Sequence, residues 1–283
     1  MVAAIDLSIQ INNVSAEEKG VTGSPKFPAI ETTQNHRRVT LVRLPYQMVY
    51  KVYGNLPKDR EVRPPLGLLY VGASLEEAGH EVKIIDAEPE MLSPEVIFER
   101  IMSQHPHVVG FTATTPEIHG VEMLCQMIKK HDPKIITMVG GSHISALPRE
   151  TLKDCPEIDY AVVGEGEVSA VHVVNNLPDE RIIRSKDIHC TDDVPLPARH
   201  LIDYKWYKYP WPGKGLVQMD VLESIRGCPF MCTFCSVRGV KPRARNVMNV
   251  VDEIENSHKK YGVKLFMFFD DTLTVNKQHV FAL

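Results

Sequence analysis

The stretch IITMVGGSH at residues 135–143 is a short apolar run that ends in two adjacent glycines. Apolar side chains at successive positions are typical of a strand that is buried on both faces of a sheet. The glycines permit a tight turn where such a strand ends. Runs of the same kind, rich in β-branched residues, occur at residues 39–44, 82–86, 108–112 and 160–164. These segments are the candidate strands of one sheet.

Helical patterns separate the candidate strands, so strand and helix alternate along the chain with short spacers. This alternation is typical of βαβ units and predicts a parallel sheet covered by helices on both faces. We therefore expect an α/β domain at residues 39–185, with the flavodoxin-like strand order of a doubly wound parallel sheet. The expected helices span residues 66–78, 94–104, 118–131, 147–154 and 167–176.

A second α/β pattern occupies residues 216–283. A strand at 216–225 leads into a loop with cysteines, and a helix at 247–261 and a strand at 264–269 follow. These elements are the first two βα units of a (β/α) barrel, which takes ~250 residues when complete. We therefore expect a partial barrel whose last strand keeps an unpaired apolar edge, in a chain that is a fragment of a longer protein.

The remaining segments lack such patterns. Residues 1–38 are polar and irregular, so we expect a mobile leader there. Residues 186–215 are rich in proline, aspartate and aromatic residues, and their prolines block a long helix. We expect this second segment to connect the α/β domain to the partial barrel.

The composition is that of a soluble globular protein, with 43% hydrophobic and 24% charged residues. A net charge of −4 gives no general attraction to nucleic acid or to acidic lipid. No apolar run approaches the ~20 residues that a membrane span needs. The amino terminus lacks a secretory pattern and the scattered cysteines form no disulfide framework, so we expect a cytoplasmic protein.

The loop RGCPFMCTFCS at residues 226–236 carries Cys228, Cys232 and Cys235 in the spacing C-x-x-x-C-x-x-C. A [4Fe–4S] cluster usually takes four cysteine thiolates. Three thiolates in one loop would hold the cluster and leave one iron open to a ligand that is not protein. A structural zinc site is the alternative, but it would need a fourth ligand, and the nearest downstream histidine, His258, has no companion. 

This loop resembles the cluster motif of radical S-adenosylmethionine (SAM) enzymes, including the R-G-C-P lead-in and the aromatic residue before the last cysteine. The resemblance implies that SAM binds the open iron and is cleaved reductively with an electron from an external flavodoxin or ferredoxin type of donor. It also implies that Phe234 packs near the adenine and that Asp270 and Asp271 hold the amino group of SAM. Alternatively, Asp271 caps the next helix. We further expect Phe230 and Phe234 to shield the cluster from water.

An α/β domain followed by this loop resembles the cobalamin-binding radical SAM enzymes, with PPLGLLYVGA at 64–73, GGSH at 140–143 and GEGE at 164–167. Ligands of open α/β sheets bind beyond the carboxyl ends of the strands, where glycines and small hydroxyls leave room. The resemblance places a corrin against the threonine-rich loop and the nucleotide tail beside the glycines. The implied cobalamin-binding residues are Thr112, Thr114, Thr115, Gly140, Gly141, Ser142 and Gly164.

Two features leave alternatives for this cobalamin site. No D-x-H-x-x-G motif follows the first strand, so a lower axial histidine from that motif is not expected. His143 could bind cobalt, although a turn histidine that makes hydrogen bonds is the more ordinary role. The glycines could also be plain strand-to-helix turns.

Three further cysteines would serve a second cluster in the related methylthiotransferases. Here Cys125 falls in the middle of a predicted helix, on its apolar face, and Cys155 and Cys190 fall in unrelated loops. The spacing therefore disfavours a second cluster.

By resemblance, the function is methyl transfer from methylcobalamin to an unactivated carbon of an organic substrate that the sequence does not identify. Oxidative ring formation on a tetrapyrrole-like substrate is a second possibility within the same class. From another class, the chain could be a non-catalytic remnant that binds cobalamin and a cluster. We name no side chain as catalytic, and we expect this 283-residue chain, with its partial barrel, to release little 5′-deoxyadenosine from SAM.

Overall fold

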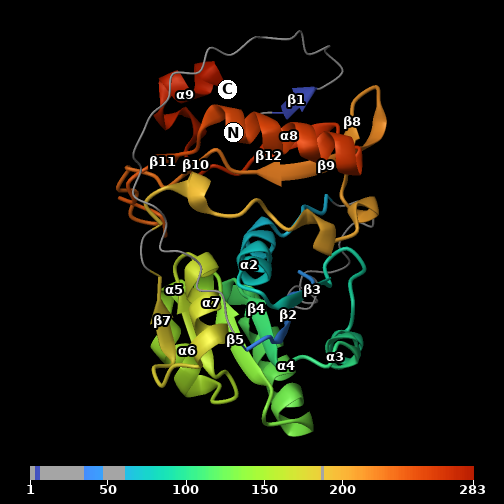
Figure 1. Cartoon of the computed structure of the whole chain (residues 1–283), viewed down its shortest axis with the longest axis vertical. Coiled ribbons are helices and arrows are strands. Elements are labelled where there is room, and N and C mark those ends of the chain that lie inside the picture. Colours follow the sequence, from blue (N-terminus) through green and yellow to red (C-terminus); the bar gives the residue numbers. More distant parts are fainter. Residues whose placement is uncertain (1–3, 7–34, 47–60, 186–187) are drawn as a thin grey trace. The chain divides into compact units, whose positions relative to one another are not determined.

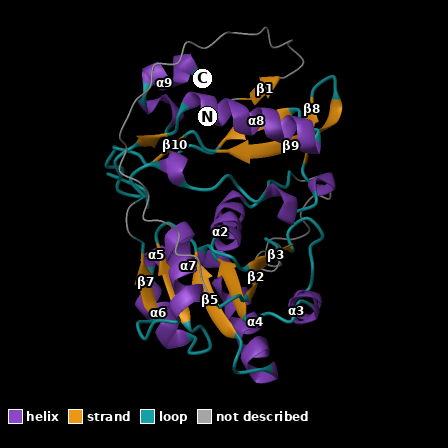
Figure 2. Ribbon diagram, viewed as in Figure 1, coloured by secondary structure: helices purple, strands orange, loops and turns teal. Residues whose placement is uncertain are grey.

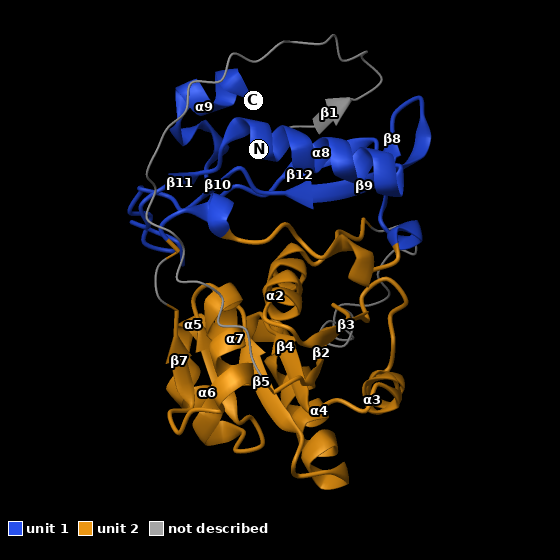
Figure 3. Ribbon diagram, viewed as in Figure 1, with its two compact units in different colours: residues 1–29, 189–193, 204–283 blue, residues 30–188, 194–203 orange. Residues whose placement is uncertain are grey.

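The structure is a computed structural model that describes residues 4–6, 35–46, 61–185 and 188–283. The chain divides into two compact units (Figure 3). The α/β unit comprises residues 30–188 and 194–203, and the barrel unit comprises residues 1–29, 189–193 and 204–283.

The α/β unit is built on a six-stranded parallel sheet with the order β3-β2-β4-β5-β6-β7 (Figures 1 and 2). The chain enters at β2, adds β3 on one side and then adds the other strands on the opposite side. This is the predicted flavodoxin-like order, and its switch point lies between β2 and β4. The strands are β2 (Arg38–Arg43), β3 (Glu81–Asp86), β4 (Val108–Thr112), β5 (Ile136–Gly140), β6 (Tyr160–Val163) and β7 (Ile182–Arg184).

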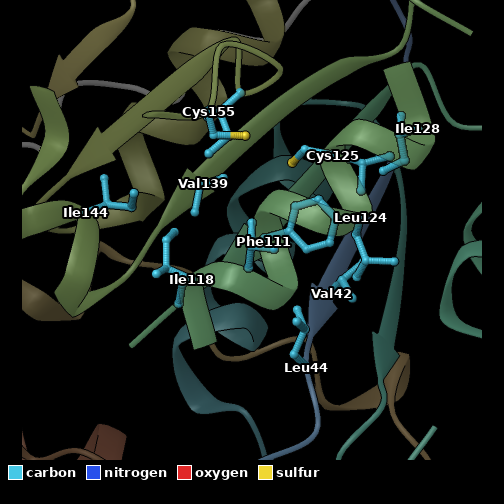
Figure 4. Close-up of a cluster of buried hydrophobic side chains, with 14 of the residues drawn as sticks. Val42, Leu44, Phe111, Ile118, Leu124, Cys125, Ile128, Val139, Ile144 and Cys155 are labelled. Atoms are coloured by element: carbon cyan, nitrogen blue, oxygen red, sulfur yellow. The ribbon is translucent and has the colours of Figure 1, made fainter. Parts of the chain in front are cut away.

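Helices cover both faces of this sheet, because alternate strand residues enter two separate cores. Val42 belongs to the core beneath α3 and α4, whereas its neighbour Leu41 belongs to the core beneath α2 and α7. Figure 4 shows the first of these cores, which includes Phe111, Val139 and Leu124 of α4. The helices are α2 (Leu66–Glu77), α3 (Pro94–Ser103), α4 (Ile118–His131), α5 (Ser142–Ala146), α6 (Pro148–Asp154) and α7 (Gly166–Asn176).

The structure adds two details to the expected α/β pattern. The expected helix at 147–154 is α6, and the structure places another short helix, α5, directly before it. Pro148 lacks the N–H that would continue α5, so the chain starts a new helix there. A sixth strand, β7, joins the sheet edge, although its three residues are too few to show a pattern in the sequence.

Cys125 lies in the core of the α/β unit, as predicted (Figure 4). Cys155 lies in the loop after α6, as predicted, and the structure adds that it belongs to the same buried cluster. Burial raises the pKa of the Cys125 thiol well above its ordinary value and raises the pKa of Cys155 to about 12. Cys190 belongs to the other unit.

The barrel unit contains the two predicted βα units, β9-α8 and β12-α9. Strands β9 (Gly215–Leu222) and β12 (Leu265–Phe268) pair in parallel, and α8 (Val247–Tyr261) connects them. Asn246 caps α8 by accepting the Met248 N–H, and Gly262 ends it at a φ of 68°. The short helix α9 (Lys277–Ala282) follows β12.

The sheet of the barrel unit has four strands in the order β1-β12-β9-β8, and neither of its outer strands was expected from the sequence. Strand β12 does not keep an open edge, because β1 (Ala4–Asp6) pairs with it antiparallel. Strand β1 lies in the segment expected to be a mobile leader; residues 1–3 and 7–34 of that segment lie outside the described residues. On the other side, β8 (Lys208–Trp211) pairs with β9 in the segment expected to be a connector. Pro210 is compatible with β8 because this strand lies at the sheet edge.

Among the described residues, no helix is both long and apolar enough to cross a bilayer.

Candidate functional site

The carboxyl ends of the central strands meet at one edge of the α/β sheet, which we call the sheet-edge site. In the register of the sheet, Arg43 at the end of β2 pairs with Thr112, and Thr112 pairs with Gly140. The predicted cobalamin-binding loops after β4 and β5 therefore start side by side, next to the switch point between β2 and β4.

Gly141 sets how closely these two loops approach. Its φ of 97° lies in the region that favours glycine. A Cβ atom there would lie 2.7 Å from the carbonyl oxygen of Ala113 and 2.8 Å from its nitrogen. The Ala113 N–H donates to Gly140 O at 3.0 Å, and the His143 N–H donates to Ala113 O at 3.1 Å. Packing of the two loops therefore already requires glycine at position 141.

His143 joins the same loops through its side chain and is buried. The Thr151 hydroxyl donates to Leu147 O at 2.7 Å, so it accepts from Nε2 of His143 at 3.1 Å. Nδ1 then accepts from the Thr115 hydroxyl at 3.2 Å. Burial lowers the pKa of His143 and favours this neutral form. Both ring nitrogens thus hold the protein together, which supports the hydrogen-bonding role over cobalt ligation.

The other hydroxyls of the site differ in what they contact. The Thr114 hydroxyl donates to Glu117 Oε2 at 2.7 Å, at the start of a short 3₁₀ helix, η2 (Thr115–Glu117). Within the described residues, the hydroxyls of Thr112 and Ser142 make no hydrogen bond. Thr112 is partly exposed and Ser142 is exposed, so both can reach a ligand at this edge.

Gly164, the last predicted glycine of the site, lies against the loop that follows β7. It has a φ of 86°, and a Cβ atom there would collide with the Ser185 hydroxyl. The Gly164 N–H donates to Ser145 Oγ at 3.1 Å, and the Glu165 N–H donates to Ser185 Oγ at 3.2 Å. Ser185 was missed by the sequence reasoning because β7 was not expected.

An ion pair between β2 and β3, beside the switch point, was also missed. Arg43 at the end of β2 binds Asp86 at the end of β3 through two hydrogen bonds, of 2.8 Å from Nε and 2.6 Å from Nη2. Each charged residue is the last residue of its strand in the structure. The pair ties the two strands on one side of the site.

In the barrel unit, the three cysteines of the C-x-x-x-C-x-x-C motif lie in the loop between β9 and α8. Cys228, Cys232 and Cys235 are all free thiols. The short strands β10 (Ile225–Arg226) and β11 (Arg243–Ala244) pair at the base of this loop. Three unpaired thiols in one loop suit an iron–sulfur cluster by their chemistry. In the described part of the chain, however, no group of three or more metal-binding side chains is gathered closely enough to hold an ion.

The aromatic residues of the loop do not shield it, contrary to expectation. Phe230 is 57% exposed and Phe234 is 92% exposed. Met231 and Val240 are exposed as well, so the apolar side chains of this loop form no core of their own. The predicted contact of Phe234 with adenine stays a prediction.

Asp270 and Asp271 follow β12 and contact the backbone that precedes the cysteines. Asp270 accepts the N–H groups of Ser224 and Ile225, and Asp271 accepts the Gly227 N–H at 2.8 Å. Burial raises the pKa of Asp270, and the hydrogen bonds from residues 225 and 224 act in the opposite direction. Their predicted role in holding the amino group of SAM stays a prediction.

The alternative role of Asp271 as a helix cap was wrong, because other residues fill that position. Asn276 caps α9 by accepting the His279 N–H, and Thr272 precedes the short 3₁₀ helix η6 (Leu273–Val275). Asp271 therefore serves the cysteine loop instead of a helix.

Comparisons with known proteins match part of the α/β unit to a known domain. Residues 59–174 match the family model of the B12 binding domain. The chain is 33% identical over 236 residues to an uncharacterized methyltransferase of Pyrococcus horikoshii, covering 76% of this chain and 50% of that protein. It is 30% identical over 243 residues to the anaerobic magnesium-protoporphyrin IX monomethyl ester cyclase of Synechocystis, covering 78% of this chain and 48% of that protein.

The fold is also similar to a solved structure of the cobalamin-dependent S-adenosylmethionine radical enzyme OxsB. The TM-score is 0.63 at 18% identity, and the match covers 83% of this chain and 34% of that one. The matched B12 binding domain and this likeness in fold agree with the resemblance of the chain to the family of radical SAM proteins that carry a B12-binding domain. The chain spans about half the length of the curated relatives that it matches.

Proposed function

We propose that the chain belongs to a cobalamin-dependent radical SAM methyltransferase and binds cobalamin, a [4Fe–4S] cluster and SAM. Bound together, these groups supply one-electron cleavage of SAM and transfer of a methyl group to an unactivated carbon. The protein's part is to bind and orient them and to exclude water. The single observation that carries the proposal is that the matched B12 binding domain precedes a loop with three free thiols in radical SAM spacing.

For cobalamin, the sheet-edge site supports the proposal by its position and its chemistry. It lies at the switch point, where ligands of such sheets bind. The loop backbones approach closely at Gly141, and Thr112 and Ser142 present hydroxyls at the same edge. We propose that Thr112, Thr114, Thr115, Gly140, Gly141, Ser142 and Gly164 form the cobalamin site.

Ser142→Trp tests this site, because the exposed position accepts a large side chain without disturbing a core. We expect the variant to bind hydroxocobalamin at least ~10-fold more weakly than the wild-type chain, measured by absorbance titration. Ser103→Trp is the control, since Ser103 is exposed at the end of α3, which leads to the opposite edge of the sheet. Equal affinity of both variants would place the cobalamin elsewhere.

For the cluster, we propose that Cys228, Cys232 and Cys235 are the ligands. Anaerobic reconstitution of the chain with iron and sulfide should give about four irons per chain, as a [4Fe–4S] cluster requires. Cys232→Ala should lose this iron, whereas Cys190→Ala should retain it because Cys190 lies outside the loop. Zinc in place of iron in the purified protein would contradict the assignment.

Methyl transfer and ring formation are distinguished by the fate of SAM. The cyclase named among the relatives supports ring formation as the second candidate. A methyltransferase that draws its methyl group from SAM releases S-adenosylhomocysteine, whereas SAM cleavage alone releases 5′-deoxyadenosine. Because the barrel in this chain is partial, we expect only low turnover of SAM by the reduced chain loaded with iron–sulfur cluster and cobalamin, and we expect that turnover to give both products. Formation of 5′-deoxyadenosine without S-adenosylhomocysteine would favour the cyclase.

A further inference from the structure

Three consecutive residues after β12 contact the chain that leads into the cysteine motif. Strands β9 and β12 end side by side, with Leu222 opposite Phe268 in the register. The Phe269 N–H extends this ladder by donating to Leu222 O at 2.8 Å. The next residues of both chains therefore leave the sheet together, at the edge where barrel proteins place their active sites.

The first two of these residues bind backbone N–H groups through carboxylates. Asp270 Oδ1 accepts the Ser224 N–H at 2.6 Å and also the Ile225 N–H, and its Oδ2 accepts the Ser224 hydroxyl at 3.1 Å. Asp271 Oδ2 accepts the Gly227 N–H at 2.8 Å. Hydrogen bonds to a charged acceptor are stronger than those between neutral groups. These contacts therefore hold residues 224–227, which we call the lead-in, firmly in place.

The third residue, Thr272, reaches a cysteine of the motif. Its hydroxyl lies 3.1 Å from Cys228 Sγ and 2.7 Å from Asp271 O. A hydroxyl has one proton to donate, so only one of these acceptors can receive it at a time. A thiolate is the stronger acceptor because it carries a full charge, and a bound cluster needs Cys228 as a thiolate.

The opposite side of the lead-in is held by backbone packing. Gly227 has a φ of 95°, and a Cβ atom there would lie 2.7 Å from Lys241 O. The Arg245 N–H donates to Ser224 O at 2.9 Å. The lead-in is thus held by residues 270–272 on one side and by Lys241 and Arg245, at the end of the cysteine loop, on the other.

We propose that Asp270, Asp271 and Thr272 form a clamp that positions the cysteine loop, and that Thr272 donates a hydrogen bond to the Cys228 thiolate. The clamp stands on the contacts above, whereas its effect on a cluster rests on the proposed function. Asp270 and Asp271 act as positioning residues through the backbone of the lead-in. Thr272 distinguishes Cys228 from Cys232 and Cys235 by its hydrogen bond.

Hydrogen–deuterium exchange on the metal-free chain tests the clamp without any cofactor. Asp270→Ala should increase amide exchange of residues 224 and 225, and Asp271→Ala should increase that of residue 227, because these N–H groups lose their acceptors. Asp252→Ala, at an exposed position of α8, should leave this exchange unchanged. Unchanged exchange of residues 250–254 in α8 shows that each variant has kept its fold. Wild-type exchange at residues 224–228 in both clamp variants would overturn the proposal.

The cluster tests the Thr272 contact, because hydrogen bonds to the sulfur ligands raise the reduction potential of an iron–sulfur cluster. In the reconstituted chain, Thr272→Val should shift the midpoint potential to a more negative value, and Thr272→Ser should restore it. Thr274→Val, at an exposed position two residues further on, should leave it unchanged. Equal potentials in the valine and serine variants would overturn the Thr272 role. If the wild-type chain takes up no iron, the cluster assignment fails, and the exchange experiment alone decides the clamp.

Discussion

At the scale of single residues, the sheet-edge site depends on Gly141, which has no side chain, and on the neutral imidazole of His143. Gly141 lets the loops after β4 and β5 come into backbone contact, and His143 then joins them through both ring nitrogens. The motif GGSH contains both residues. Its physical role in this chain is to hold two ligand-binding loops at a fixed separation.

Gly141→Ala should destabilise the chain more than the same change at Gly79. Both glycines have a φ near +95°, at 97° and 95°, so both variants carry backbone strain of about 1 kcal/mol. Only Gly141 has backbone atoms in the way of a Cβ, whereas Gly79 has nothing within 4 Å. Urea unfolding should give a loss above ~2 kcal/mol for Gly141→Ala. Equal losses in the two variants would show that the loops can move apart freely.

His143 should make the stability depend on pH. Its pKa in the folded chain is below the ordinary value of 6.5, so its contribution is fully present above about pH 6.5 and is lost as the pH falls toward the lowered pKa. The free energy of unfolding should therefore decrease from pH 7.5 to 5.5, by less than the ~1.4 kcal/mol per pH unit that one proton can produce.

His143→Gln is the matched variant, because an amide can replace both hydrogen bonds without titrating. The pH dependence of its free energy of unfolding should be flatter than that of the wild-type chain. Some dependence should remain, since burial also lowers the pKa values of His80 and His107. An unchanged slope would mean that His143 does not contribute. Glu122, which raises the pKa of His143, and His119, which lowers it, are the neighbouring side chains to keep unchanged in these variants.

At the scale of elements, the sequence predicted the helices and strands that are long enough to show a periodic apolar pattern, and it missed the shortest strands. The five strands of the α/β sheet and α8 with both of its caps have enough apolar residues to show a period, and each was confirmed. Strands β1, β7 and β8 have three or four residues, which is too few for a pattern. They form because a neighbouring strand offers unpaired backbone groups.

The candidate site follows the same division. The cysteines and the glycine-rich loops are local motifs, and a local motif can be found in one sequence. The contacts of His143 and Asp270 join residues that lie 28 and 46 positions apart, and no local pattern marks them. Such hydrogen bonds become visible only when the fold brings the strand ends together.

The amino-terminal cap of α8 should contribute measurably to the barrel unit. Asn246→Ala removes the acceptor of the Met248 N–H and should lower the free energy of unfolding by about 1 kcal/mol. Asn246→Asp keeps an acceptor at the same place and should retain most of the stability. Urea unfolding followed by circular dichroism measures both. Equal losses in both variants would show that the cap is not what position 246 provides.

At the scale of the whole molecule, the division into two compact units predicts unfolding that is not two-state. The α/β unit has its own cores beneath α3 and α4 and beneath α2 and α7. Because ligand binding stabilises only the structure that binds, hydroxocobalamin should raise the midpoint temperature of one calorimetric transition and leave the other in place.

Hydrogen–deuterium exchange assigns the two transitions. Peptides from α4 and β5 should gain protection with hydroxocobalamin, whereas peptides from α8 and β12 should not. A single transition that shifts as a whole would show that the units unfold together.

The pairing of β1 with β12 has a consequence for any longer version of this sheet. A strand has one set of N–H and C=O groups on each side, and β9 occupies one side of β12 while β1 occupies the other. A further barrel strand could join β12 only by displacing β1. Residues 4–6 therefore compete with any further barrel strand for the same edge of β12, and only one of the two can pair with β12 at a time.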